Sequence, residues 1–348
     1  MPAPGLARRL SIMVQAHWWR SRPSLAMRLL QPLSWVYDAL ATWAEHRQGP
    51  VQTVGVPVIV VGNLVVGGAG KTPTVIALID QLRLQGWTPG VVSRGYGRTG
   101  DGLVEVLAGS PAALTGDEPL LIHRRTGARV MVGRDRVAAA RALLQAHPEV
   151  DLLLSDDGLG QRRLPREVEL VVFDGRGAGN GLTLPAGPLR RPLPAALSPR
   201  MLVLYNADAP STPLPGFSAR RSLASPVPLA AWWAGDRAAA LPWSAFGGRR
   251  LLAAAGLGEP ERFFRTLEAE GLCIDRLALP DHASFSPLPW PPGAREILVT
   301  EKDAAKLPSD AVGSTQVWVV ALDFQLPPAL MQEMQRRLPV PPSHRAAP

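Results

Sequence analysis

The feature that most constrains this chain is an apolar strand that runs into a glycine-rich loop and then into a helix. The strand is predicted over Val56–Val61, and the loop ends in Gly70-Lys71-Thr72, where a helix up to Gln85 begins. Glycines allow backbone N–H groups to point into such a loop, and the start of the following helix favours an anion. In this arrangement Lys71 would neutralise the β- and γ-oxygens of a nucleotide, and the Thr72 hydroxyl would ligate Mg²⁺.

The expected nucleotide-binding residues are Val65, Val66, Gly67, Gly68, Ala69, Gly70, Lys71 and Thr72. The strict form of the pattern has a glycine five places before Gly70, and this chain has Val65 there. The loop therefore has a variant spacing, and a chance glycine-rich turn is the alternative. The order of strand, loop, Gly-Lys-Thr and helix favours nucleotide binding.

The rest of the chain alternates short β-branched strands with amphipathic helices, which predicts an α/β fold with parallel strands and crossover helices. Together with the loop, this indicates a P-loop NTPase-like, doubly wound, mainly parallel sheet. A Pro- and Ser-rich stretch, Ala209–Pro228, then separates a second, smaller α/β domain. We expect residues 1–50 to form a basic, amphipathic helical segment, 51–215 the nucleotide-binding domain, 216–330 the smaller domain and 331–348 a C-terminal tail.

Composition narrows the classes of protein that are possible. Cys273 is the one cysteine among 348 residues, which excludes a disulfide framework and any multi-cysteine zinc or iron–sulfur site. The net charge is +8, and residues 1–50 hold six arginines against two acidic residues. A basic protein attracts the phosphates of nucleic acid, anionic lipid or nucleotide, and composition does not choose among them. Residues 48–70 are uncharged but contain six glycines, so no transmembrane helix is predicted there.

The basic N-terminal segment suits a membrane surface. Apolar stripes at helical spacing comprise Leu10, Val14 and Trp18, and then Leu33, Val36, Tyr37, Leu40 and Trp43. Four of the ten tryptophans lie in this segment, at positions 18, 19, 35 and 43. Trp and Arg together favour the lipid headgroup layer. The alternative is that these helices pack their stripes on the core of the protein itself.

Carboxylates follow a later buried strand. Val150–Leu154 leads into Asp156 and Asp157, and an Asp at the end of a buried strand is the usual second Mg²⁺ ligand beside a P-loop. The alternative is a pair of aspartates that cap a helix. Two further polar loops, Ser93–Gly97 and Gly116–Pro119, would line the same crevice at the carboxyl ends of the strands.

Taken together, the motifs resemble one family, the tetraacyldisaccharide 4'-kinases, or lipid A 4'-kinases. The matching stretches recur in the family's order from residue 56 to about residue 307. They are Val61–Leu64, Gly67–Pro73, Ser93–Gly97, Gly116–Pro119, Asp156–Leu159, Leu184–Arg190, Ala255–Phe264, Pro280–His282 and Thr300–Ala304.

The resemblance implies an enzyme that transfers the γ-phosphate of ATP, with Mg²⁺, to the 4'-hydroxyl of a lipid A disaccharide 1-phosphate. Asp117 would be the general base, paired with His282 from the second domain, and Lys71 would neutralise the transferring group. The implied metal ligands are Thr72, Asp156 and Asp157, and the implied substrate residues are Arg94, Tyr96 and Glu118. The glycolipid would be the partner, at the cytoplasmic face of the bacterial inner membrane, with peripheral attachment and with no nucleic acid or obligate protein partner.

Two positions depart from the family pattern. The family usually has Gln-His after Asp-Asp-Gly-Leu, where this chain has Gly160-Gln161-Arg162, and it tends to have Glu where Arg191 stands. A carboxylate that could assist Mg²⁺ is therefore missing at position 191. The rival hypotheses are a membrane-associated nucleotide switch that gates a protein partner and a nucleic-acid-dependent ATPase. Much of the positive charge lies in Trp-rich amphipathic sequence, which argues against the nucleic-acid-dependent ATPase.

Overall fold

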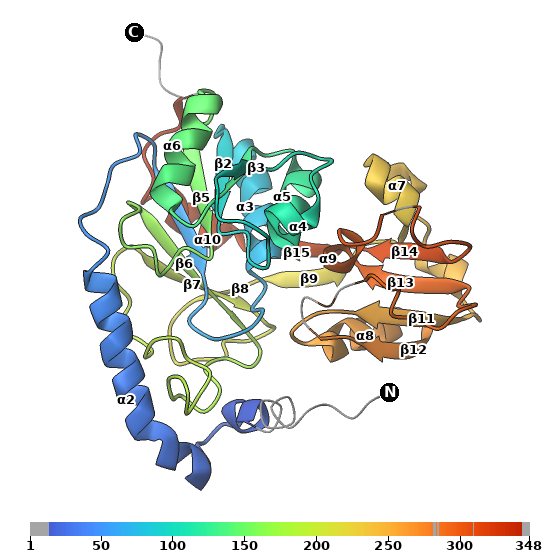
Figure 1. The fold of residues 1–348 in the computed structure, drawn as a ribbon, viewed down its shortest axis with the longest axis horizontal. Helices are drawn as coiled ribbons and strands as arrows, with labels where there is room; N and C mark the ends of the chain where they lie inside the picture. The colour runs from blue at the N-terminus through green and yellow to red at the C-terminus, as the bar shows by residue number, and fades with distance from the viewer. Residues whose placement is uncertain (1–13, 281–282, 284, 309, 343–348) are drawn as a thin grey trace.

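The computed structural model describes residues 14–280, 283, 285–308 and 310–342, which form two α/β domains and a long N-terminal helix (Figure 1). The first domain is built on an eight-stranded sheet of order β3-β4-β2-β5-β1-β6-β7-β8, parallel except where β3 pairs with β4. Its strands are β1 (Val58–Gly62), β2 (Pro89–Ser93), β3 (Val104–Glu105), β4 (Val130–Val132), β5 (Leu152–Asp156), β6 (Val168–Asp174), β7 (Met201–Asn206) and β8 (Phe217–Ser218). The predicted fold class is confirmed.

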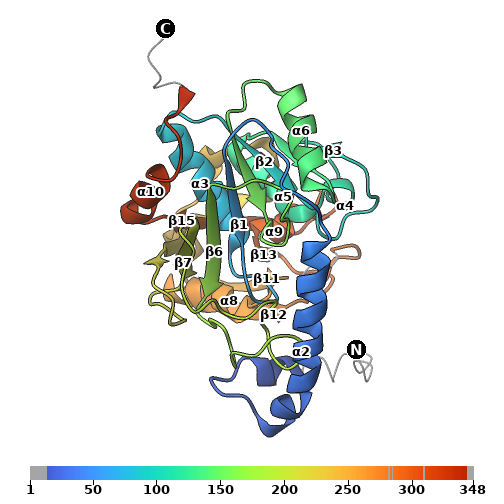
Figure 2. The same cartoon turned by 90° about the vertical axis from the view of Figure 1, so that its left-hand side faces the viewer.

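Helices cover both faces of this sheet, and the alternation of side chains along β1 shows how (Figures 1 and 2). Ile59 and Val61 pack in the cluster that contains α3 (Lys71–Leu84) and α5 (Asp117–Thr126). Val58 and Val60 pack in the cluster that contains α6 (Arg136–Ala146). All five β1 residues are buried, as expected for a central strand covered on both sides. The short helix α4 (Ala112–Thr115) precedes α5.

The second domain is a five-stranded sheet of order β10-β14-β13-β11-β12, parallel apart from β10. Its strands are β10 (Val227–Pro228), β11 (Arg250–Ala255), β12 (Cys273–Ala278), β13 (Glu296–Thr300) and β14 (Gln316–Val320), with helices α7 (Leu229–Ala234), α8 (Pro260–Ala269) and α9 (Glu301–Ala304). Phe263, Phe264 and Leu267 of α8 are buried against β11, so the predicted strand–helix pattern forms a core of its own.

The chain passes between the two domains twice, and its C-terminal part is divided between them differently from the expected boundaries. An antiparallel ladder pairs β9 (Arg220–Leu223) with β15 (Leu322–Gln325) between the domains. The chain then returns in α10 (Pro328–Gln335), whose Leu330, Met331 and Met334 are buried in the core of the first domain. The expected boundary at residue 331 therefore falls inside a helix of the first domain, and residues up to Gln335 are not a tail.

The long helix α2 (Leu25–His46) lies along the outer edge of the first domain (Figures 1 and 2). Its inner face is fixed by Ser34, whose hydroxyl donates to the Thr183 carbonyl at 2.8 Å, and by Asp38, which accepts from the Thr183 hydroxyl at 2.8 Å. Its apolar stripe faces outward, and the exposed members are Leu25, Leu29, Leu33, Val36, Leu40 and Trp43. The alternative in which this stripe packs on the core is wrong for these residues. Within the described ranges, no helix is both long and apolar enough to span a bilayer.

Candidate active site

The glycine-rich loop leaves β1 and ends where α3 begins at Lys71, at the carboxyl edge of the parallel strands. Three consecutive carbonyl oxygens of the loop each accept a hydrogen bond from a side chain. Asn63 Nδ2 donates to the Gly67 oxygen at 3.0 Å, Arg176 Nη2 to the Gly68 oxygen at 3.0 Å, and Asn206 Nδ2 to the Ala69 oxygen at 3.1 Å. The N–H of a trans peptide points opposite to its carbonyl, so the amides of residues 68–70 are directed away from these three side chains. The three carbonyls are thus engaged by side chains, which leaves these amides available to bind an anion.

Two glycines of the loop adopt a backbone conformation that side chains disfavour. Gly67 has φ of 90° and Gly70 has φ of 89°, both in the left-handed region. At Gly70 the neighbouring chain also approaches closely, because a Cβ placed there would lie 1.9 Å from Asn206 Nδ2. Asn206 ends β7, so the order of strands in the sheet brings it beneath the loop.

Lys71 lies at the start of α3 with its ammonium group held between two strands. Its Nζ donates to Asn63 Oδ1 at 3.2 Å and lies 3.6 Å from Asp157 Oδ1. Thr72, the next residue, is buried. The residues that sequence reasoning assigned to phosphate and metal therefore meet at one edge of the sheet.

The two aspartates at the carboxyl end of β5 have pKa values shifted in opposite directions. Asp156 is buried, its Oδ2 accepts from Ser93 Oγ at 3.1 Å, and its Oδ1 has no hydrogen-bond partner among the described residues. Burial raises the pKa of Asp156 to about 7, and nearby Glu118 and Asp157 act in the same direction against Lys71. Burial would also raise the pKa of Asp157, but Lys71 and Arg190 outweigh it and hold that pKa below its usual range.

These residues fit a magnesium ion. No group of three or more His, Cys, Asp or Glu side chains with metal-binding geometry is found in the described part of the chain. Mg²⁺ in nucleotide sites is usually held by one or two carboxylates, a hydroxyl, water and substrate phosphates, so a larger cluster is not required. The buried, unpartnered Oδ1 of Asp156 is the atom that such an ion would satisfy.

Asp117 lies at the first turn of α5 beside the second domain. Its Oδ2 is 3.6 Å from Lys306 Nζ, and Lys306 also contacts Asp303 Oδ1 at 3.2 Å. One residue along, Glu118 Oε1 lies 3.4 Å from Lys302 Nζ. The side chains that flank Asp117 therefore come from the segment that follows β13. His282, its expected partner, lies outside the described residues.

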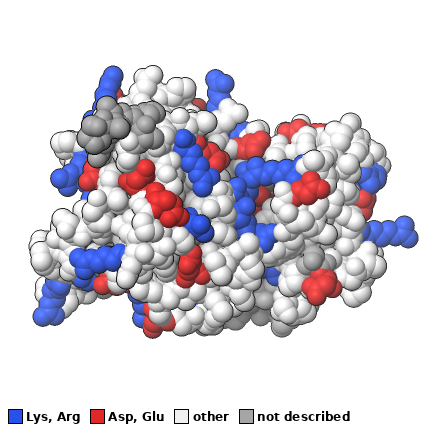
Figure 3. Space-filling model, turned by 90° about the horizontal axis from the view of Figure 1, so that it is seen from above, with Lys and Arg blue, Asp and Glu red and all other residues white. Residues whose placement is uncertain are grey.

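The contact between the two domains continues along α5. Arg125 pairs with Glu301 at 2.5 Å, and the Trp232 indole N–H donates to the same carboxylate at 2.9 Å. Figure 3 shows basic and acidic side chains intermixed where the two lobes meet. This half-buried network holds the second domain against the helix whose first turn carries Asp117.

The loop after β2 completes this edge of the sheet. Gly95 approaches Gly116 so closely that a Cβ at Gly116 would lie 3.1 Å from the Gly95 Cα, which places Arg94 and Tyr96 beside the start of α5. Both Arg94 and Tyr96 are exposed to solvent. They are therefore on the open side of the site, whereas Asp117 is buried.

Sequence reasoning missed several polar residues of this site. Arg136 is fully buried at the start of α6, donates to the Asp156 carbonyl at 3.5 Å, and has its pKa lowered to about 10 by burial. Asn206 is the last residue of β7, Arg176 follows β6, and Arg190 lies 3.4 Å from Asp157. The signal that could have identified Asn206 and Arg176 was their position at the carboxyl ends of parallel strands, because these ends share the edge of the sheet where the site lies.

The two departures from the family pattern share one ion-pair partner. Arg191 and Arg162 both pair with Glu45 of α2, the latter at 3.7 Å. In this chain the arginine at position 191 therefore connects α2 to the loops beside the site.

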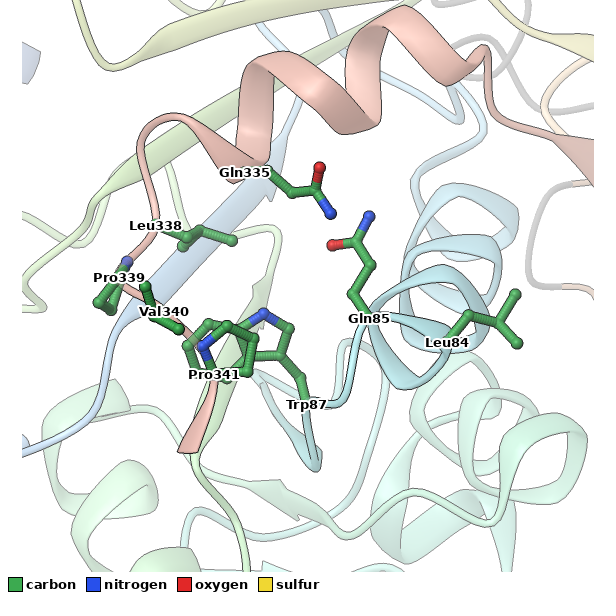
Figure 4. Close-up of a pocket in the computed structure, with 8 residues that line it drawn as sticks. All are labelled: Leu84, Gln85, Trp87, Gln335, Leu338, Pro339, Val340 and Pro341. Carbon is green, nitrogen blue, oxygen red and sulfur yellow. The ribbon is translucent and has the colours of Figure 1, made fainter. Parts of the chain in front are cut away.

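The cavity in Figure 4 is separate from this site. It measures about 370 Å³ and is lined by Leu84, Gln85, Trp87, Gln335, Leu338, Pro339, Val340 and Pro341. It lies at the end of α3, which starts at the loop; at 1.5 Å per residue, this is about 20 Å away. Among the described residues no charged side chain lines this cavity, so this lining does not suit a triphosphate.

A mainly parallel sheet with this loop at its carboxyl edge defines a nucleotide-binding protein of the P-loop class. The LpxK family model, described as tetraacyldisaccharide-1-P 4'-kinase, matches residues 26–339. The chain belongs to this family and is a kinase, which confirms the resemblance.

Similar proteins match nearly the whole length of the chain in sequence or in structure. The tetraacyldisaccharide 4'-kinase of Methylibium petroleiphilum is 54% identical over 329 residues, which cover 92% of each chain. That of Dechloromonas aromatica is 46% identical over 93% of this chain and 97% of its own. The crystal structure of LpxK from Aquifex aeolicus in complex with ATP has a TM-score of 0.72 at 24% identity, covering 90% of this chain and all of that one. The structural likeness shows a shared fold.

Proposed function

We propose that this kinase transfers the γ-phosphate of ATP to the 4'-hydroxyl of a tetraacyldisaccharide 1-phosphate at a membrane surface. The single observation that carries the proposal is the loop whose Gly67, Gly68 and Ala69 carbonyls are held by side chains, within a member of this family. The names of the relatives supply the acceptor, and the loop supplies the donor site.

The loop amides of residues 68–70 and the Lys71 ammonium would bind the β- and γ-phosphates. Phosphoryl transfer requires alignment and charge neutralisation more than covalent chemistry from the protein. Lys71 is preorganised for this because Asn63 and Asp157 already hold its Nζ. ATP would therefore bind without a large rearrangement of the lysine.

Thr72, Asp156 and Asp157 would hold Mg²⁺, which neutralises the charge that develops on the phosphates. Asp156 supplies a carboxylate oxygen with no described partner. Lys71 and Arg190 lower the pKa of Asp157, which favours its ionised form. The phosphate oxygens would complete the ligand set.

Asp117 would accept the proton of the sugar 4'-hydroxyl. The hydroxyl oxygen would bond to the γ-phosphorus as the bond between that phosphorus and ADP breaks. Its buried position at the helix start is suited to orient an acceptor, and His282 would be its partner from the second domain. Lys306 approaches Asp117 from the same domain, so contact between the domains and assembly of the base would be linked. Arg94, Tyr96 and Glu118 would face the glycolipid.

The outward stripe of α2 would lie in the membrane surface and receive the acyl chains. It combines exposed leucines and tryptophans with arginines such as Arg28 and Arg47, and Arg47 stacks 4.5 Å from the Trp43 ring. A contiguous apolar face of this kind on a basic segment is typical of interfacial helices. We infer peripheral attachment at the cytoplasmic face of the bacterial inner membrane.

The proposal is tested by incubating the protein with γ-labelled ATP, Mg²⁺ and a tetraacyldisaccharide 1-phosphate, followed by analysis of the lipid product. We expect label in a bisphosphorylated lipid, and Asp117→Asn should lower kcat at least ~100-fold with ATP affinity little changed. Asp275→Asn, an exposed acidic residue of β12, is the matched control and should leave kcat unchanged. ATP hydrolysis that depends on a protein and ignores the glycolipid would favour the nucleotide switch instead.

A further inference from the structure

Arg176 connects the glycine-rich loop to the N-terminal segment. We propose that it is a positioning residue: Trp19 holds its guanidinium on the loop, so the seating of the N-terminal segment sets the affinity for the nucleotide. The proposal rests on the proposed function in one respect, that this loop binds ATP. Arg176 follows β6 and is not among the residues that the sequence motifs singled out.

The guanidinium of Arg176 is held on two sides. Its Nη2 donates to the Gly68 carbonyl at 3.0 Å and to Asp174 Oδ2 at 2.6 Å, and its Nε donates to the same carboxylate oxygen at 3.0 Å. Asp174 is buried at the end of β6 and also accepts from the Arg176 backbone N–H at 2.9 Å. Because a carboxylate fixed in the sheet orients it, the planar group has one direction in which to reach the loop.

Trp19 covers the guanidinium. The Arg176 Cζ lies 4.1 Å from the centre of the Trp19 ring, within the range of a favourable cation–π contact. Trp19 is half-buried and packs against the core cluster around Phe173 and Tyr205. It is therefore a contact within the protein and is distinct from the outward stripe of α2.

The chain around Trp19 is anchored to the loops that follow β6. The Asn180 N–H donates to the Trp18 carbonyl at 2.7 Å, and the Trp18 indole N–H donates to the Pro185 carbonyl at 3.0 Å. At Gly179 a Cβ would lie 2.3 Å from the Trp18 oxygen, so the two segments are in close contact. Six residues later α2 begins, and it carries the proposed membrane face.

The Arg176 side chain thus links the glycine-rich loop to the N-terminal segment. If Trp19 leaves, Arg176 loses the ring that restricts it, and the Gly68 carbonyl is held less firmly in the orientation that turns the next amide toward the phosphates. By thermodynamic reciprocity, ATP that orders the loop would also favour the seated N-terminal segment. The coupling requires no movement of the catalytic residues.

The test measures the dissociation constant of ATP by calorimetry in full-length variants. Trp19→Leu should weaken ATP binding about 3- to 10-fold, and Trp19→Phe, which keeps an aromatic face, should restore most of it. Arg176→Ala should weaken binding at least as much. In the double variant Trp19→Leu/Arg176→Ala, the loss should match Arg176→Ala alone, because both changes remove one contact.

Arg250→Ala is the matched control, since Arg250 also pairs with an aspartate, Asp275 at 2.6 Å, but is exposed on β11 of the second domain and has no role in the proposed site. It should leave the ATP dissociation constant unchanged. Additive losses in the double variant, or unchanged ATP affinity in Trp19→Leu, would overturn the coupling. If the wild-type protein bound no ATP, the proposed function itself would fail, so the two failures are distinguishable.

Discussion

Substitution of Gly70 by alanine tests the geometry of the loop with a magnitude that follows from the structure. Gly70 has φ of 89°, and placing an alanine in the left-handed region costs about 1–2 kcal/mol. The new Cβ would also lie 1.9 Å from Asn206 Nδ2, so the Asn206 amide must move and release the Ala69 carbonyl. Loss of that buried hydrogen bond costs about 1–3 kcal/mol more. We therefore expect Gly70→Ala to lower the free energy of unfolding by about 2–5 kcal/mol.

The assay is urea unfolding of the ligand-free protein, with Gly68→Ala as the matched control in the same loop. At Gly68 φ lies outside the left-handed region and an added Cβ meets no atom within 4 Å, so that change should cost less than about 0.5 kcal/mol. In an Asn206→Ala background, Gly70→Ala should cost only the backbone part, about 1–2 kcal/mol. Equal losses at Gly68 and Gly70 would refute the reasoning.

Two further predictions follow from buried charge and from the exposed helix. Asp156→Asn should raise the Tm of the ligand-free protein by several degrees at pH 8 and by less near pH 4. Burial raises the pKa of Asp156 in the folded protein to about 7, so the wild type loses stability between pH 4 and pH 7 and the variant does not. A difference in Tm that does not depend on pH would contradict this. Leu40→Asp in α2 should weaken binding to anionic lipid vesicles at least ~10-fold in a flotation assay. Leu84→Asp, at an exposed leucine of α3, is the control and should leave vesicle binding unchanged. Equal effects of the two substitutions would contradict membrane binding through α2.

The loop and the sheet could be predicted from the sequence because their signals are local. The residues from Val56 to Thr72 contain strand, glycines and helix start in order, and each has a physical reason to be there. The paired aspartates at the carboxyl end of β5 were predicted for the same reason. Lys71 and Asp157 do meet, 3.6 Å apart.

What the sequence did not reveal depends on long-range packing. Asn206 and Arg176 reach the loop only because β6 lies beside β1 and β7 lies beside β6, an order that no local pattern specifies. The stripe of α2 has the same period whether it faces a core or a membrane, and only the contacts of Ser34 and Asp38 decide that it faces outward. The return of α10 to the first domain was missed because short apolar runs next to prolines resemble a frayed end.

The central claim is that the amides of residues 68–70 and the Lys71 ammonium bind the triphosphate. Titration calorimetry of ATP with Mg²⁺ into the wild-type protein and into Lys71→Met tests it most directly. We expect one ATP per chain in the wild type and affinity at least ~10-fold weaker in Lys71→Met, since a charge-assisted contact to phosphate is lost. Absence of measurable heat from the folded wild type, or equal affinity in the two proteins, would contradict the account.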